Sequence, residues 1–145
     1  MTPLFRKLNL PVTSAEMVVV DAPDTFEPTL AEVQCSMPKL VVSTAWAPHT
    51  PFALVFARTE NAVAMAAAAA GEYTEGDAII WLAYPKKSSK RYHCAFNRDT
   101  GFAPFGRFGF EPVRQVAIDD DWSALRFRRV EFIKNLTRNP SMRLT

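Results

Sequence analysis

Two apolar segments on either side of an alanine-rich segment constrain the fold of this chain most strongly. Residues 52–57 (FALVFA) and 77–83 (DAIIWLA) show almost no polar alternation, which is typical of strands that are covered on both faces of a sheet. Between them, Thr59 is suited to cap a helix over residues 60–70, and Gly71 is expected to end that helix. Two strands joined through one such helix form a parallel, right-handed βαβ unit. The centre of the protein is therefore predicted to be an α/β sheet.

Shorter segments extend this sheet towards the N-terminus. Residues 17–20 (MVVV) indicate a buried strand that ends in a turn, and a helix is expected over residues 28–34. Residues 39–44 (KLVVST) indicate a further strand, which stops before the proline-rich segment 48–51.

The C-terminal part is predicted to add an antiparallel hairpin at the edge of the sheet. Its strands are expected over residues 112–118 (PVRQVAI) and 124–130 (ALRFRRV), separated by three aspartates. The second segment alternates apolar residues with Arg126 and Arg128. Arginines on an edge strand discourage edge-to-edge aggregation, which gives their charge a structural explanation.

Aromatic residues recur at every third position in the segment before the hairpin. Phe102, Phe105 and Phe108 lie beside Arg98 and Arg107, and such a combination can stack nucleic-acid bases. The same spacing places the three rings on the core-facing side of a short helical segment, and this packing interpretation is favoured. Trp122, which opens the last strand, is likewise expected in the core.

Length and composition indicate one globular domain. With 145 residues, 48% of them apolar and 22% charged, the chain can bury a core without disulfides or metal. We expect a single domain over residues 1–145, with an N-terminal extension at 1–15 and a basic, flexible tail at 131–145. Cys35 and Cys94 have neither metal-type spacing nor a disulfide framework and are expected to be free thiols.

The chain is expected to be cytoplasmic and not to enter a membrane. Its first residues lack the apolar stretch of a signal peptide. The alanine-rich run at residues 61–71 is about half as long as the roughly 20 residues that a membrane span needs.

Charge is distributed unevenly along the chain. Residues 1–80 contain 4 Lys or Arg against 9 Asp or Glu, whereas residues 81–145 contain 13 against 6. Such asymmetry is typical of a protein with an anionic partner, and a solvated basic face explains it equally well.

Polar and basic residues follow the carboxyl ends of the expected strands, where open α/β sheets bind their ligands. Positive charges and hydroxyl donors in such a loop suit a phosphate or a carboxylate. The candidate ligand-binding residues are Asp21, Arg58, Tyr84, Lys86, Lys87, Ser88, Ser89 and Lys90.

The sequence identifies no catalytic constellation, no metal site and no cofactor. His49 lies between prolines, and His93 and Cys94 are neighbours whose side chains point apart on an extended segment. The aspartates at 119–121 lack the spaced ligands and the glycine of a calcium loop.

Taken in order, the segments FALVFARTENAVAMAAAAAGEYTEGDAIIWLAYPKK and GFEPVRQVAIDDDWSALRFRRV resemble the later half of a methyltransferase-type Rossmann domain. That fold ends in strand, helix, strand, helix and an antiparallel hairpin, often preceded by Gly-Phe, here Gly109 and Phe110. The segments IIWLAYPK and DDDWSALRFR also resemble small bacterial proteins of unknown function with a reduced Rossmann layout. The resemblance covers residues 17–130 and implies a single three-layer, Rossmann-like α/β domain with a mostly parallel sheet that ends in an antiparallel hairpin.

Two departures from that family pattern concern the cofactor. S-adenosylmethionine is bound through a glycine-rich turn after the first strand, whereas this chain reads VVVDAPDTFEP there. An acidic residue normally ends the second strand, where this chain offers Ser43 and Thr44. The chain is also short for seven strands with their helices, and methyl transfer is therefore not the favoured function.

Three functions stay open. The first is a non-catalytic binding or regulatory module whose basic rim, at residues 86–98, accepts an anionic small molecule or partner. The second is a transferase-like enzyme with a reduced active site, which requires Asp21, Arg58 and Lys86 to meet in one pocket. The third is a nucleic-acid-binding accessory protein, whose affinity would fall steeply with salt. An apolar surface over residues 102–110 would also favour a homo-oligomer.

Overall fold

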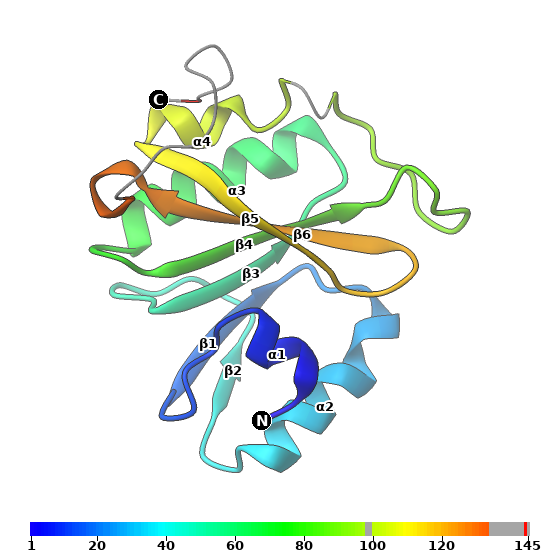
Figure 1. Cartoon of the computed structure of the whole chain (residues 1–145), viewed down its shortest axis with the longest axis vertical. Helices are drawn as coiled ribbons and strands as arrows, with labels where there is room; N and C mark the ends of the chain where they lie inside the picture. Colours follow the sequence, from blue (N-terminus) through cyan, green and yellow to red (C-terminus); the bar gives the residue numbers. More distant parts are fainter. Residues whose placement is uncertain (98–99, 134–143, 145) are drawn as a thin grey trace.

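The structure is a computed structural model that describes residues 1–97, 100–133 and 144. Within these residues the strands form one six-stranded sheet in the order β2-β1-β3-β4-β6-β5 (Figure 1). The first four strands in this order are parallel to one another, and β6 is antiparallel to both β4 and β5. The strands are β1 (Glu16–Val20), β2 (Val41–Ser43), β3 (Phe52–Phe56), β4 (Ile79–Pro85), β5 (Phe110–Ala117) and β6 (Trp122–Arg129).

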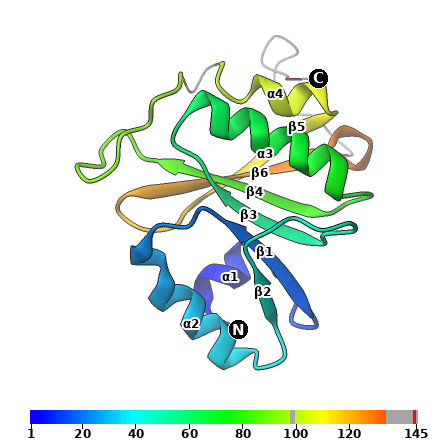
Figure 2. The ribbon, with the colours of Figure 1, turned by 180° about the vertical axis from the view of Figure 1, so that it is seen from behind.

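Helices cover both faces of this sheet, so the domain has three layers. The first two helices lie on one face and the last two on the other, as the views from front and back agree (Figures 1 and 2). The α/β fold with a parallel sheet and a terminal antiparallel hairpin is thus confirmed. The helices are α1 (Pro3–Lys7), α2 (Glu27–Ser36), α3 (Glu60–Tyr73) and α4 (Ala103–Arg107), with 3-10 turns η1 (Asp24–Phe26) and η2 (Val130–Phe132).

The segment 1–15 takes part in the core. Phe5 and Leu8 are fully buried in the apolar cluster under α1 and α2. The indole Nε1 of Trp81 in β4 donates a hydrogen bond to the carbonyl of Leu8 at 2.8 Å, which fixes the end of α1 over the middle of the sheet.

Helix α3 begins as predicted but ends later. The Thr59 hydroxyl accepts from the Ala62 amide at 3.1 Å, as an N-cap does. The predicted stop at Gly71 is wrong, because the helix continues to Tyr73. A Cβ on Gly71 would lie 2.6 Å from Cδ1 of Phe108, so this glycine gives room to a ring of the neighbouring α4 segment.

An aromatic core fills the space between α3, α4 and the hairpin. The rings of Phe105 and Phe127 stack with centroids 3.9 Å apart, and Phe102 packs against Phe127 at 5.9 Å. The packing interpretation of the Phe repeat is confirmed for Phe102 and Phe105, whereas Phe108 keeps 46% of its surface exposed. Most of the apolar surface that suggested an oligomer therefore lies inside the chain.

The predicted hairpin is present, but its arginines do not lie on an edge strand. Strand β6, which carries Arg126 and Arg128, pairs with β4 on one side and β5 on the other. The edge strand is β5, so protection of a sheet edge does not account for these charges. Trp122 opens β6 with 2% of its surface exposed, which confirms its place in the core.

Other boundaries move by a few residues. Strand β2 has three residues instead of six, α2 is longer than residues 28–34, and β4 begins at Ile79 and runs to Pro85.

In the described part of the chain, no helix has the length and apolar character needed to cross a membrane. Most of the predicted tail, residues 134–143 and 145, lies outside the described residues.

Candidate functional site

The strand order reverses between β1 and β3, and a groove lies at this point. The chain leaves β1 through α2 to reach β2 on one side, then returns to β3 on the other side of β1. Ligands of open α/β sheets bind beyond the carboxyl ends of the strands at such a switch point. The groove here has a volume of about 380 Å³ and is lined by the end of β1, by Trp46, by β3 and by α3.

The groove exists because the connection between β2 and β3 contains no helix. Helix α3 packs on β3 and β4, whereas the connection between β2 and β3 is a loop at residues 44–51, from which Trp46 lines the groove. From this loop Trp46 packs half-buried against the core, with its ring stacked on Tyr73 at 6.4 Å. Met65 of α3 remains 65% exposed at the groove.

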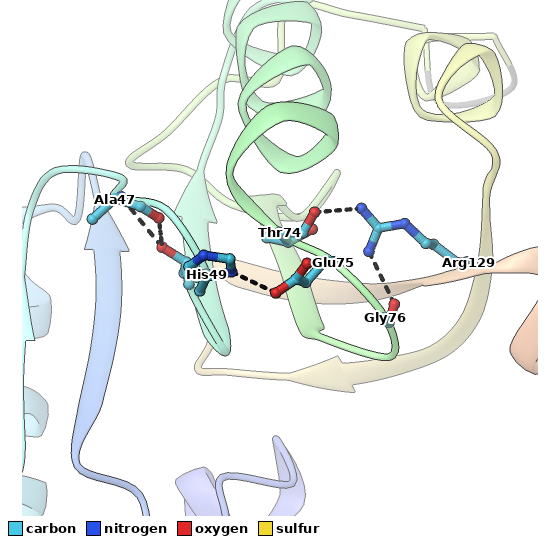
Figure 3. Close-up of polar contacts among 7 residues, drawn as sticks. Ala47, His49, Thr74, Glu75, Gly76 and Arg129 are labelled. Carbon is cyan, nitrogen blue, oxygen red and sulfur yellow. Dashed lines mark hydrogen bonds and ion pairs between the residues drawn. The ribbon is translucent and has the colours of Figure 1, made fainter.

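Hydrogen bonds hold this loop in place. The Thr50 hydroxyl donates to the Ala47 carbonyl at 2.6 Å, and the Thr50 amide donates to the Tyr73 carbonyl at 3.0 Å. His49 of the loop pairs with Glu75, which follows the end of α3 (Figure 3). The loop that carries Trp46 is therefore anchored to the end of α3.

Asp21 supplies the carboxylate of the groove. It follows β1 directly and adopts a left-handed conformation with φ of 57°, which aspartate tolerates better than most residues. This is the turn where the methyltransferase pattern has glycine. The backbone bends there as a glycine would allow, but an exposed carboxylate lines the groove.

The first turn of α3 forms the opposite wall. Thr59 and Asn61 line the groove, and the Asn61 amide group donates to the Met65 sulfur at 3.5 Å. The N-terminus of a helix attracts electron-rich groups, because its first amides lack partners within the helix. The groove thus combines an apolar body, one carboxylate and a helix N-terminus.

The basic loop lies at the same edge of the sheet and is partly structural. The Lys86 amide donates to the Asp121 carbonyl at 2.7 Å, and the Ser89 hydroxyl donates to the Asp121 carboxylate at 2.8 Å. Ser89 also accepts from the Tyr92 amide at 3.0 Å. The side chains of Lys87, Ser88 and Lys90 are exposed.

Arg58 lies in a cluster of side chains with Tyr92, Trp122 and Thr25. Its guanidinium lies 5.5 Å from the centre of the Tyr92 ring, which packs on Trp122 at 5.0 Å. The Tyr92 hydroxyl is 3.4 Å from the Thr25 hydroxyl at η1. This cluster ties the basic loop to the turn after β1.

Among the predicted site residues, Tyr84 is not on the rim. It is 6% exposed, its ring packs edge-on against Phe96 and Phe102, and its hydroxyl accepts from Gln115 at 3.1 Å. The groove contains Asp21 but neither Arg58 nor Lys86. The three side chains required for the reduced active site therefore do not meet in this groove.

Sequence reasoning missed most of the groove. Trp46, Asn61 and Met65 belong to no recognisable motif. The one usable signal was an aromatic residue, Trp46, in the loop between two predicted strands.

The other residues considered as possible catalytic or metal-binding groups make local structural contacts. Cys94 donates to the Phe96 carbonyl at 3.8 Å, and the Asp119 carboxylate accepts from the Asp121 and Trp122 amides in the hairpin turn.

Comparisons with known proteins support the fold. No protein-family model matches the sequence, and a search of curated protein sequences finds no match. Solved structures do match. A SAM-dependent methyltransferase from Aquifex aeolicus has a TM-score of 0.58 at 8% identity and covers 88% of each chain. The fold is that of the Rossmann-like methyltransferases.

Two further structures support the same assignment of the fold. The N-methyltransferase NodS from Bradyrhizobium japonicum has a TM-score of 0.54 at 10% identity, covering 87% of this chain and 92% of its own. The fibrillarin from Aeropyrum pernix, in complex with natively bound S-adenosyl-L-methionine, has a TM-score of 0.50 at 10% identity, covering 81% and 68%.

Proposed function

We propose that this chain is a small-molecule-binding domain that holds a nucleoside-type ligand in the groove at the switch point. The observation that carries the proposal is the position of Asp21, Trp46 and the first turn of α3 around one groove at the carboxyl ends of β1 and β3. Its volume of about 380 Å³ falls within the size of common ligand pockets.

Each wall of the groove suits one part of such a ligand. The half-buried indole of Trp46 offers a flat apolar surface on which a base can stack. The Asp21 carboxylate can accept hydrogen bonds from ribose hydroxyls or from an amine. The first amides of α3 that the Thr59 cap leaves unpaired within the helix can donate to an acceptor or a carboxylate at the other end of the ligand.

The first compounds to test are S-adenosylmethionine and S-adenosylhomocysteine. The fibrillarin from Aeropyrum pernix, which has the same fold, holds S-adenosylmethionine. The turn after β1 contains Asp21, Ala22 and Pro23 where glycines would let the backbone approach the cofactor. The proposal is therefore limited to binding and assigns no catalytic residue.

An anion at the basic loop is a second proposal. It is supported by the exposed side chains of Lys87, Ser88 and Lys90 beside the same edge of the sheet. Inorganic phosphate tests it, because the double variant Lys86→Ala/Lys87→Ala removes two of its charges without altering the groove. Equal phosphate affinity in this variant and the wild type would rule the anion out at this loop.

Isothermal titration of the full chain with S-adenosylmethionine, S-adenosylhomocysteine and adenosine tests the main proposal. Asp24→Asn is the matched control for Asp21→Asn, because both carboxylates are exposed near the same turn and only Asp21 lines the groove. We expect Asp21→Asn to weaken binding by about tenfold or more, the usual effect of losing a hydrogen bond to a charged group. Asp24→Asn should change it by less than about twofold.

Two outcomes would contradict the proposal. One is the absence of binding of all three compounds to the wild type. The other is an equal loss in the Asp21→Asn and Asp24→Asn variants, which would show that general charge and not the groove determines affinity.

A further inference from the structure

Three arginines lie together on the face of the terminal hairpin that faces α1. Arg126 of β6 stands directly opposite Arg114 of β5 in the strand register, and Arg128 lies two residues further along β6. Their common face follows from their contacts. Arg126 pairs in register with Trp81, whose ring lies in the core under α1, and Arg114 donates to the Asn9 side chain at 3.4 Å.

Within the part of the chain that the structure describes, Arg128 is the member of this cluster that forms an ion pair. Arg128 donates two hydrogen bonds to the Asp77 carboxylate, both at 2.7 Å. Glu111 stands opposite Arg128 in the strand register, and its carboxylate accepts a hydrogen bond from the Leu144 amide at 2.7 Å. Arg114 is exposed and Arg126 is half-buried, and no ion pair of either is found among the described residues.

Arg126 has the least favourable surroundings of the three arginines. Its Nε is buried, and among the described residues it has no hydrogen-bond partner. Burial and the charge of Arg128 lower its pKa from the ordinary value, with a smaller contribution in the same direction from Arg114. Like charges directly opposite each other destabilise a pair of strands, and a buried donor without a partner costs further stability.

We propose that Arg114, Arg126 and Arg128 form a binding site for a phosphate group. A guanidinium presents a planar fork of donors that matches the oxygens of a phosphate. A dianionic phosphate would balance the charges of Arg114 and Arg126 and would accept from the terminal N–H groups of their guanidinium groups. The site is separate from the groove at the switch point and does not depend on the ligand proposed there.

The phosphate belongs either to a small phosphomonoester or to a nucleic-acid backbone, and titrations separate these sources. The full chain is titrated with inorganic phosphate, with glycerol 3-phosphate and with a short single-stranded oligonucleotide. Tighter binding of the oligonucleotide with a steep loss in salt identifies a backbone, whereas comparable binding of the monoester identifies a small molecule.

Arg126→Gln is the decisive variant, with Arg107→Gln as its matched control. Arg107 is an exposed arginine on α4, across the sheet from the cluster. We expect Arg126→Gln to weaken glycerol 3-phosphate binding by about tenfold or more and Arg107→Gln by less than about twofold. Arg114→Gln should also weaken glycerol 3-phosphate binding. This second variant tests the site if Arg126→Gln does not fold.

Thermal unfolding without phosphate separates a binding role from a structural one. Because Arg126 faces Arg114 and leaves its Nε without a partner, Arg126→Gln should leave the Tm unchanged or raise it. The proposal is overturned if the wild type binds none of the three probes, or if Arg126→Gln and Arg114→Gln bind as the wild type does. A Tm that falls by many degrees in Arg126→Gln, or a loss confined to Lys86→Ala/Lys87→Ala, would overturn it as well.

Discussion

The face of the sheet that carries α3 and α4 is filled differently at its two ends. Over β4, β6 and β5, buried rings such as Phe105 and Phe127 fill the space below the helices. Over β1 and β2, the half-buried Trp46 lies on a loop, and a groove remains beside it. The groove therefore lies where no helix follows β2, whereas apolar rings fill the other end of the same face.

Removal of Phe105 tests the closed end and should have the largest effect. Its ring is 1% exposed and stacks on Phe127, so Phe105→Ala should lower the free energy of unfolding by about 3–5 kcal/mol. Met65→Ala, at the open end, should change it by less than about 0.5 kcal/mol because Met65 is 65% exposed. Denaturant unfolding measures both, and similar losses would show that the two ends are packed alike.

Removal of Trp46 should have an intermediate effect. The ring is only half-buried and packs on Tyr73, so we expect Trp46→Ala to cost about 1–2 kcal/mol, less than the loss of a fully buried ring. The same denaturant experiment measures it. A loss as large as that of Phe105→Ala would mean that the loop is part of the core and that no groove is open there.

Gly71 allows a finer comparison at the junction of α3 and α4. An alanine inside a helix usually stabilises by about 1 kcal/mol relative to glycine. Here its Cβ would meet the Phe108 ring at 2.6 Å, so Gly71→Ala should destabilise by about 1 kcal/mol. In a Phe108→Ala background the same change should become stabilising, and a double-mutant cycle measures this reversal. If the effects of the two substitutions on stability are additive, the contact between residue 71 and the Phe108 ring does not affect stability.

The Asp77–Arg128 pair should have the smallest effect on stability, and the size of this effect depends on pH. Hydrogen bonds from Arg128 hold the pKa of Asp77 below its ordinary value of 3.8. A lowered folded-state pKa adds stability above the unfolded value, and this is lost as pH falls through the folded one. Both groups are about one-third exposed, so the gain at neutral pH is below about 1 kcal/mol.

Arg128→Gln should therefore be slightly less stable than the wild type at pH 7, and the two should converge as pH falls below 3.8. Denaturant unfolding across this pH range checks the convergence. A difference that persists unchanged in acid would mean that Arg128 stabilises through contacts other than Asp77.

The sequence predicted those parts of the fold that depend on local patterns. The fully apolar strands and the Thr59 cap are visible in one short window each, and the parallel strands and the hairpin follow from them. Gly71 was misread because its role depends on Phe108, which is distant in sequence. The position of β6 inside the sheet was missed for the same reason. The residues of a hairpin do not determine which of its two strands pairs with the rest of the sheet.

The candidate site was predicted only in part. The rule that ligands bind beyond the carboxyl ends of strands pointed to Asp21 and to the loop at 86–90. Tyr84 looked like a rim residue, but its strand continues to Pro85 and buries it. Trp46 could not be placed, because its loop is oriented by Thr50 and Tyr73 and not by a motif of its own.

The indole signals of the three tryptophans give the most direct test of the central claim, that the groove at the switch point binds a ligand. Trp81 and Trp122 are buried, whereas Trp46 lines the groove. In a two-dimensional NMR titration of the full chain with S-adenosylhomocysteine, we expect the Trp46 indole signal to shift, together with the amide group of Asn61. The other two indole signals should stay in place. An unchanged Trp46 signal alongside shifts confined to residues 86–90 would contradict the account.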